Sequence, residues 1–205
     1  MGNAWFDQVV FEGIENLEQT RTQKYAGDGF DLAGTAMQLL AGETATRLLH
    51  HAYFEPLGLP AMPLDQMGAG ARPTVFELAL LGQILANEGR YGEWEFFSRK
   101  TFEAILPTPY EGIEHPDPDN KVHFYGLGNR WVREDRDEAG RPLFSRRTIG
   151  HGSFSFSVFQ VDLDNGLVIA QVREFGGKAD ATWYPQFLRA VRRIALPDHA
   201  PPPKK

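Results

Sequence analysis

The sequence predicts an α+β fold in which a helical segment is followed by an antiparallel sheet and a C-terminal helix. Apolar residues recur with helical spacing in several stretches between residues 31 and 106. From residue 123 onward the pattern changes to short apolar runs that are typical of strands, and residues 181–195 return to an amphipathic helical pattern. Helices grouped before strands favour an α+β fold over an alternating α/β one.

Three helices are expected before the sheet in addition to a short one over 98–106. The first two cover 31–41, which Gly42 ends, and 44–54, which ends ahead of Pro56.

The clearest helix covers 75–87, where Thr74 and Glu77 have the spacing of a capping box and Gly89 follows the last turn. This helix has almost no polar face, so we expect it to lie inside a domain.

The predicted strands lie at 123–132, 143–150, 154–162 and 167–174. Asn165-Gly166 separates the last two, and this dipeptide is a strong signal for a hairpin turn. The sequence divides into a lead-in of uncertain structure at 1–24, the main region at 25–196 and a proline-rich tail at 197–205 that we expect to be disordered.

Composition excludes several classes of function. The chain has 205 residues, a net charge of −6 and no cysteine, so it has no disulfide, no thiolate metal site and no basic stripe to attract nucleic acid. No apolar run is long enough to span a membrane. The first residues, M-G-N-A-W-F, do not have the pattern of a signal peptide, and the cellular compartment stays open.

Histidines and acidic residues do not form a recognisable metal motif. His50 and His51 are adjacent and would point about 100° apart on a helix, while His115 and His123 flank an acidic loop. None of these has the paired spacing of a zinc site. We therefore predict no metal and no cofactor.

No serine of this chain has the sequence context of an activated nucleophile. None lies in G-x-S-x-G, and no lysine follows any of them at the third position, as S-x-x-K requires. The five serines are Ser98, Ser145, Ser153, Ser155 and Ser157.

Several segments, in order, resemble one family. They read Y-A-G-D-G-F-D-L-A-G at 25–34, F-E-P-L-G-L at 54–59, G-A-G at 68–70 ahead of 74–89, Y-G-L-G at 125–128, G-H-G at 150–152 and a hairpin at 161–169. Together they are similar to the second half of the serine β-lactamases, penicillin-binding DD-peptidases and related esterases. The resemblance implies the β-lactamase/transpeptidase-like fold, present here as a partial domain.

The resemblance also implies roles for individual residues. In this family a serine of S-x-x-K attacks a β-lactam, peptide or ester carbonyl to give an acyl-enzyme. Tyr25 occupies the place of the tyrosine that shuttles the proton of this serine. His151 stands in the place of the Lys or His of the K-T-G or H-T-G strand. The backbone N–H of Phe154 would stabilise the oxyanion.

Three further positions belong to the implied substrate pocket. Gly152 follows His151 in the motif. Gly27 replaces the usual Asn, which removes an amide that contacts substrate, and Ser153 replaces the usual Gly where substrate approaches the backbone. Outside the family context, Tyr25 also fits a half-buried aromatic before a helix, and His151 a histidine packed on a sheet.

Two functional hypotheses follow. The first is a serine hydrolase part that lacks the S-x-x-K segment, is inactive alone, and acts on a small ester, β-lactam or peptide once a missing N-terminal segment is supplied. The second is a non-catalytic β-lactamase-like binding module. A broken half would expose apolar surface and form homo-oligomers, whereas a stand-alone module would be monodisperse.

Overall fold

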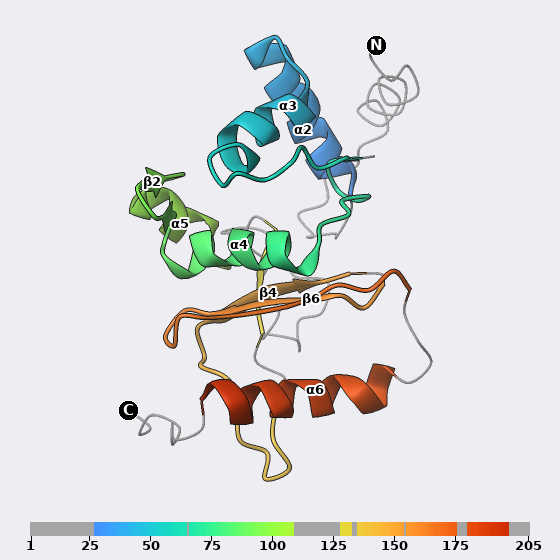
Figure 1. The fold of residues 1–205 in the computed structure, drawn as a ribbon, viewed down its shortest axis with the longest axis vertical. Helices are drawn as coiled ribbons and strands as arrows, with labels where there is room; N and C mark the ends of the chain where they lie inside the picture. Colours follow the sequence, from blue (N-terminus) through green and yellow to red (C-terminus); the bar gives the residue numbers. More distant parts are fainter. Residues whose placement is uncertain are drawn as a thin grey trace, which may run out of the picture. The chain divides into compact units, whose positions relative to one another are not determined.

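The computed structural model describes residues 27–64, 66–108, 128–132, 135–153, 155–175 and 180–196. Contacts divide the chain into two compact units, and all described residues belong to the larger one, which comprises Ala26–Thr108 and Val122–Lys205. The predicted α+β class is confirmed, because helices precede a four-stranded antiparallel sheet that a last helix follows (Figure 1).

The first two predicted helices are present, but the first begins earlier than expected and the second ends in a π-helical turn. Helix α2 (Asp28–Ala41) begins three residues earlier than expected and ends at Gly42, whose φ of 72° favours glycine. The second predicted helix consists of α3 (Ala45–Leu49) and a π-helical turn, η1 (His50–Phe54). Single π-helical turns of this kind are frequent at functional sites.

Helix α4 (Val75–Ala86) has the predicted capping box, since the Thr74 hydroxyl accepts from the Glu77 amide and the Glu77 carboxylate accepts from the Thr74 amide. The expectation that this helix is buried on all sides is wrong for the described residues. Its first turn is open, with Val75 52% and Phe76 65% exposed. Only one face packs on the sheet.

The contact between α4 and the sheet depends on a glycine. A Cβ atom at Gly82 would lie 2.5 Å from Val168 Cγ1 and 3.1 Å from Phe159 Cε2, which is too close for any side chain. The small residue lets the helix backbone approach the sheet closely.

Two short elements lie between α4 and the sheet. The strands β1 (Arg90–Tyr91) and β2 (Trp94–Glu95) form a small hairpin that the sequence did not predict. Helix α5 (Arg99–Ile105) is the predicted short helix, with Ser98 as its N-cap and Phe102 only 1% exposed.

The main sheet has the order β3-β4-β5-β6, with every pair antiparallel. Its strands are β3 (Arg130–Trp131), β4 (Thr148–Gly152), β5 (Val158–Asp162) and β6 (Leu167–Gln171). The last three are shorter than predicted, and residues 123–127 of the first predicted strand lie outside the described residues. The predicted hairpin between the last two is confirmed, and residues 163–166 form its turn.

A buried carboxylate, that of Asp162, organises this turn. It is 0% exposed and accepts hydrogen bonds from the backbone amide of Ser145 (3.0 Å) and from the backbone and side-chain nitrogens of Asn165 (3.3 and 2.7 Å). Asn165 therefore acts through its side-chain amide as well as through its turn preference.

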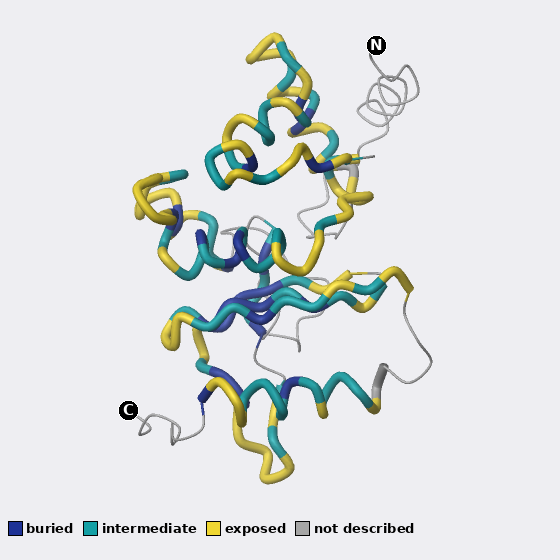
Figure 2. Tube along the Cα trace, in the orientation of Figure 1, coloured by how far each residue is buried: buried dark blue, intermediate teal, exposed yellow. Residues whose placement is uncertain are grey.

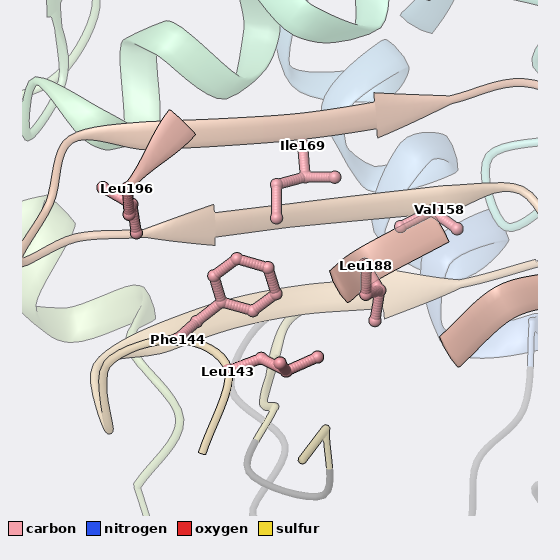
Figure 3. Close-up of a cluster of buried hydrophobic side chains, with 6 residues drawn as sticks. All are labelled: Leu143, Phe144, Val158, Ile169, Leu188 and Leu196. Carbon is pink, nitrogen blue, oxygen red and sulfur yellow. The ribbon is translucent and has the colours of Figure 1, made fainter. Parts of the chain in front are cut away.

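Helix α6 (Asp180–Ala195) covers the sheet face opposite α4 (Figure 1). Alternate residues of a strand face opposite sides, so Phe159 and Val168 contact α4 while their neighbours face α6. The core on the α6 side consists of Leu143, Phe144, Val158, Ile169, Leu188 and Leu196 (Figure 3). Of the helices described, none is both long and apolar enough to cross a lipid bilayer.

Candidate active site

The start of α2 lies against the loop at 66–70, so two of the segments that carry the family resemblance meet in space. The Asp31 carboxylate accepts a hydrogen bond from the Met67 amide at 2.7 Å. A Cβ atom at Gly68 would lie 2.9 Å from Gly27 Cα, and one at Gly34 would lie 2.4 Å from Met67 Cγ. Close packing therefore favours glycine at position 34 of the first segment and at position 68 of the second.

Gly27 itself is a different case, because nothing in its surroundings demands a glycine. Its φ of −68° is accessible to any residue, and a Cβ atom added there meets no atom within 4 Å. The residue is exposed. The space that an asparagine side chain would need at this position is present.

His151 lies on β4, in the middle of the predicted Gly-His-Gly motif. It pairs with Phe159 of β5 and is half-buried, and its Nδ1 contacts the carbonyl of Gly152. The two flanking glycines differ in the space around them. A Cβ atom at Gly150 would lie 2.4 Å from the Phe159 carbonyl oxygen, whereas one at Gly152 meets nothing within 4 Å. Packing therefore requires glycine at 150 only.

After β4 the chain turns through a ladder of serine hydroxyls. The Oγ atoms of Ser153 and Ser155 are 2.9 Å apart and those of Ser155 and Ser157 are 3.1 Å apart, while the Ser157 amide donates to Ser153 Oγ at 2.9 Å. Phe156 has a φ of 59°, a rare conformation for a bulky residue, and its side chain is exposed. Ser153, which departs from the family pattern, is thus part of what fixes this loop.

A cavity of about 210 Å³ lies at this end of the sheet, and it brings together three of the predicted site residues, His151, Gly152 and Ser153. Gly27 is not among the residues that line it. Tyr25 and Phe154 lie outside the described residues.

Sequence reasoning missed the polar part of this cavity, which comes from three separate elements. Gln160 Nε2 donates to Asp135 Oδ2 at 2.9 Å and to the Tyr184 hydroxyl at 3.0 Å, and Arg130 also lines the cavity. The one local signal was a glutamine within the otherwise apolar start of β5, V-F-Q-V-D. In the part of the chain that the structure describes, no three His, Asp or Glu side chains are grouped to hold a metal ion.

Comparisons with known proteins were informative only at the level of structure. No protein-family model matches the chain, and no curated protein is recognisably similar in sequence. A crystal structure of a β-lactamase from Mycobacterium bovis superposes on 85% of this chain with a TM-score of 0.67 and 23% identity. The fold is β-lactamase-like. An inferred β-lactamase from Bacteroides dorei superposes on 82% of this chain with a TM-score of 0.58 and 19% identity.

This chain covers 65% of the length of the M. bovis protein and 57% of the length of the B. dorei protein. At identities below 25%, the likeness establishes the fold, which agrees with the fold implied by the sequence resemblance. Function has to be argued from the site itself.

Proposed function

We propose that this chain is part of a β-lactamase-related serine hydrolase of the acyl-enzyme type, that it forms walls of the substrate pocket, and that it is inactive without an S-x-x-K segment. The observation that carries the proposal is the position of His151. It lies on a strand of a β-lactamase-like sheet, between two glycines and beside a cavity. The sequence resemblance implies that His151 takes the place of the Lys or His of the family's third motif.

In the proposed reaction a serine hydroxyl supplied by the S-x-x-K segment attacks the carbonyl of a β-lactam, ester or peptide, and the leaving group departs with a proton. Tyr25 would relay that proton, and His151 would donate a hydrogen bond to the acid group of the substrate or to the tyrosine. The backbone amide of Phe154 would stabilise the oxyanion. Water then releases the acyl group.

Two departures from the family support the competing proposal of a non-catalytic binding module. Gly27 lacks the usual amide, although an asparagine would have room there, and Ser153 Oγ is engaged with Ser155 and Ser157. A chain that no longer binds acyl substrates would tolerate both changes. The experiment therefore has to measure substrate binding as well as turnover.

The first arm of the test is covalent labelling. The purified chain is incubated with a fluorescent penicillin and with p-nitrophenyl acetate, and its intact mass is measured. We expect no adduct, because no serine here has an activating lysine. Co-expression with a segment that carries S-x-x-K should restore labelling on the added serine. A stable adduct on a serine of this chain, or no labelling after reconstitution, would contradict the proposal.

The second arm measures non-covalent binding of benzylpenicillin by NMR titration. We expect His151→Ala to weaken binding about tenfold and His151→Lys to retain it, since both imidazole and ammonium donate to a carboxylate. Gly27→Asn should strengthen binding by restoring an amide. His51→Ala, on the exposed surface of η1, is the matched control and should change nothing. Binding that is indifferent to His151 would favour the non-catalytic module.

A further inference from the structure

Phe156 lies in the loop 153–157 that joins β4 to β5, between the paired residues Gly152 and Val158. Its φ of 59° lies in the left-handed region, which glycine and asparagine adopt easily but which strains a bulky side chain. The residue is also 47% exposed, so its ring gains only part of the stabilisation that burial would give. Phenylalanine is therefore an unfavourable residue for the fold at this position.

Hydrogen bonds at both ends of the loop hold Phe156 in this conformation. The Phe156 amide donates to the Ser153 carbonyl at 3.0 Å, and the Ser157 amide donates to the Ser153 hydroxyl at 2.9 Å. The Arg173 amide donates to the Ser157 hydroxyl at 2.9 Å, which ties the loop to the chain that follows β6. Strained residues persist only where their surroundings fix them, and they concentrate at active sites and ligand clamps. The strain at Phe156 therefore points to a role in binding.

The position of Phe156 gives its ring access to a bound molecule. Phe156 lines the cavity of about 210 Å³ in the candidate active site, together with His151 and Ser153. An aromatic ring that is open on one side can pack against a ring of a ligand. Exposure alone does not single out Phe156, because Phe175 is 76% exposed and is not among the residues that line the cavity. The combination of strain, exposure and the cavity does.

We infer that Phe156 determines substrate specificity by packing its ring against an aromatic group of the acyl substrate. This inference rests on the proposed function, in which His151 donates a hydrogen bond to the acid group of the substrate or to the tyrosine. It adds that the preferred substrate carries an aromatic ring as well as an acid group. The stability that the fold loses at Phe156 is then explained by what the ring contributes to binding.

The test compares two penicillins that differ only in the ring. Benzylpenicillin has a benzyl group where 6-acetamidopenicillanic acid has a methyl group, and the β-lactam and the carboxylate are the same. Each is titrated into the purified chain, and its dissociation constant is obtained from NMR chemical shifts. We expect benzylpenicillin to bind about fivefold more tightly, which is a typical effect of one pair of aromatic rings. Equal affinity for the two would overturn the inference.

Three variants at two phenylalanines locate the preference. Phe156→Asn removes the ring and supplies a residue that tolerates the left-handed backbone, and it should bind the two penicillins with equal affinity. Phe156→Tyr keeps a ring and should keep the preference. Phe175→Asn removes an exposed phenylalanine outside the cavity, and this matched control should also keep it. A preference that survives in Phe156→Asn, or that is lost in Phe175→Asn, would refute the inference.

Thermal unfolding separates a role in binding from a role in the fold. Because Phe156 is strained and exposed, Phe156→Asn should not lower Tm. A decrease of more than about 4 °C, which corresponds to the loss of a packed side chain, would overturn the inference.

His151→Ala tests the proposed function separately. It should weaken the binding of both penicillins by about the same factor and leave the ratio of their affinities as it is in the wild type. Equal affinities in a wild type that depends on His151 would refute the inference alone. A Phe156-dependent preference without any effect of His151→Ala would count against the proposed function, and with it against an acyl substrate at Phe156. If the wild type bound neither penicillin, the inference would fail, and labelling after reconstitution with the S-x-x-K segment would decide the proposed function.

Discussion

The two helices at opposite ends of the described chain, α2 and α6, differ in how their apolar residues are used. In α6 the side chain of Leu188 is 0% exposed, and it packs in a cluster with Val158 and Ile169 of the sheet (Figure 3). In α2 Leu39 is 80% and Leu40 90% exposed. Figure 2 shows the same contrast, with the buried residues concentrated around the sheet.

This difference shows that the apolar side chains of a helix become buried only where another part of the protein covers them. The sheet offers one face to α4 and the other to α6, and both faces are occupied. Among the described residues, α2 has no comparable surface against its leucines. In the described part of the chain, apolar burial is therefore concentrated around the sheet, and the exposed leucines of α2 contribute little to it.

The largest predicted effect compares a leucine from each region. Leu188→Ala removes a fully buried side chain and should lower the free energy of unfolding by about 3 kcal/mol, which corresponds to a decrease in Tm of about 9 °C for a chain of this size. Leu40→Ala, on the exposed side of α2, should stay within about 0.5 kcal/mol of the wild type. Both are measured by chemical and thermal denaturation.

Equal destabilisation by the two variants would show that Leu40 is covered in solution. That outcome would mean that another surface packs against α2, so the two regions would not differ in how their leucines are buried. It would be checked by repeating the denaturation at several protein concentrations, since a partner copy makes Tm depend on concentration.

A smaller effect is expected at the sheet end, where two aspartates, Asp162 and Asp164, differ in burial and in their partners. Asp162→Asn keeps the shape of a fully buried carboxylate that accepts three hydrogen bonds, but it replaces one acceptor oxygen by a donor. We expect a loss of about 2 kcal/mol. Asp164→Asn, in an exposed ion pair with Arg147 at 3.3 Å, is the matched control and should change stability by less than about 0.5 kcal/mol.

If the two aspartate variants changed the free energy of unfolding equally, the Asp162 carboxylate would not be needed to hold the hairpin. The turn would then depend on the preferences of Asn165 and Gly166 alone.

The parts of the fold that the sequence predicted correctly are those with local signals. The capping box at Thr74 fixed the start of α4, and Asn165-Gly166 located the hairpin. The lengths of the last three strands were overestimated, because alternation of apolar residues continues beyond the residues that pair. The expectation that α4 is buried all round failed at Phe76, since the sequence shows how apolar a helix is but not what covers it.

The residues of the candidate site also fall into those with a local sequence signal and those without one. His151, which lines the cavity, was predicted as a site residue because two glycines flank it, and this pattern is local. Gln160, Asp135 and Tyr184 could not be found, because they are separated by more than twenty residues and meet only through strand register and helix packing. The roles of all six predicted site residues stay predictions, and two of these residues, Tyr25 and Phe154, lie outside the described part of the chain.

The smallest effect concerns two surface carboxylates, Glu55 and the less exposed Asp137, whose pKa values are lowered for different reasons. For Glu55 the main cause is a hydrogen bond from the His51 side chain, with Nδ1 to Oε2 at 2.8 Å. For Asp137 the main cause is the backbone amide of Arg141, at 2.8 Å from Oδ1, and the Arg141 side chain adds to it. A side-chain cause can be removed by mutation, whereas a backbone cause persists.

We therefore expect His51→Ala to raise the pKa of Glu55 back toward its ordinary value, and Arg141→Ala to leave much of the lowering of the Asp137 pKa in place. Carboxylate NMR titrations of each variant measure this. A lowered pKa stabilises the fold above the ordinary value of 4.5 for Glu55, and the stabilisation is lost as pH falls through the folded pKa. Because Glu55 is exposed and Asp137 lies at the surface in a turn, the contribution to unfolding is small and the titration is the decisive readout. A Glu55 pKa that stays low without His51 would contradict this prediction and would leave the nearby charge of His50 as the cause.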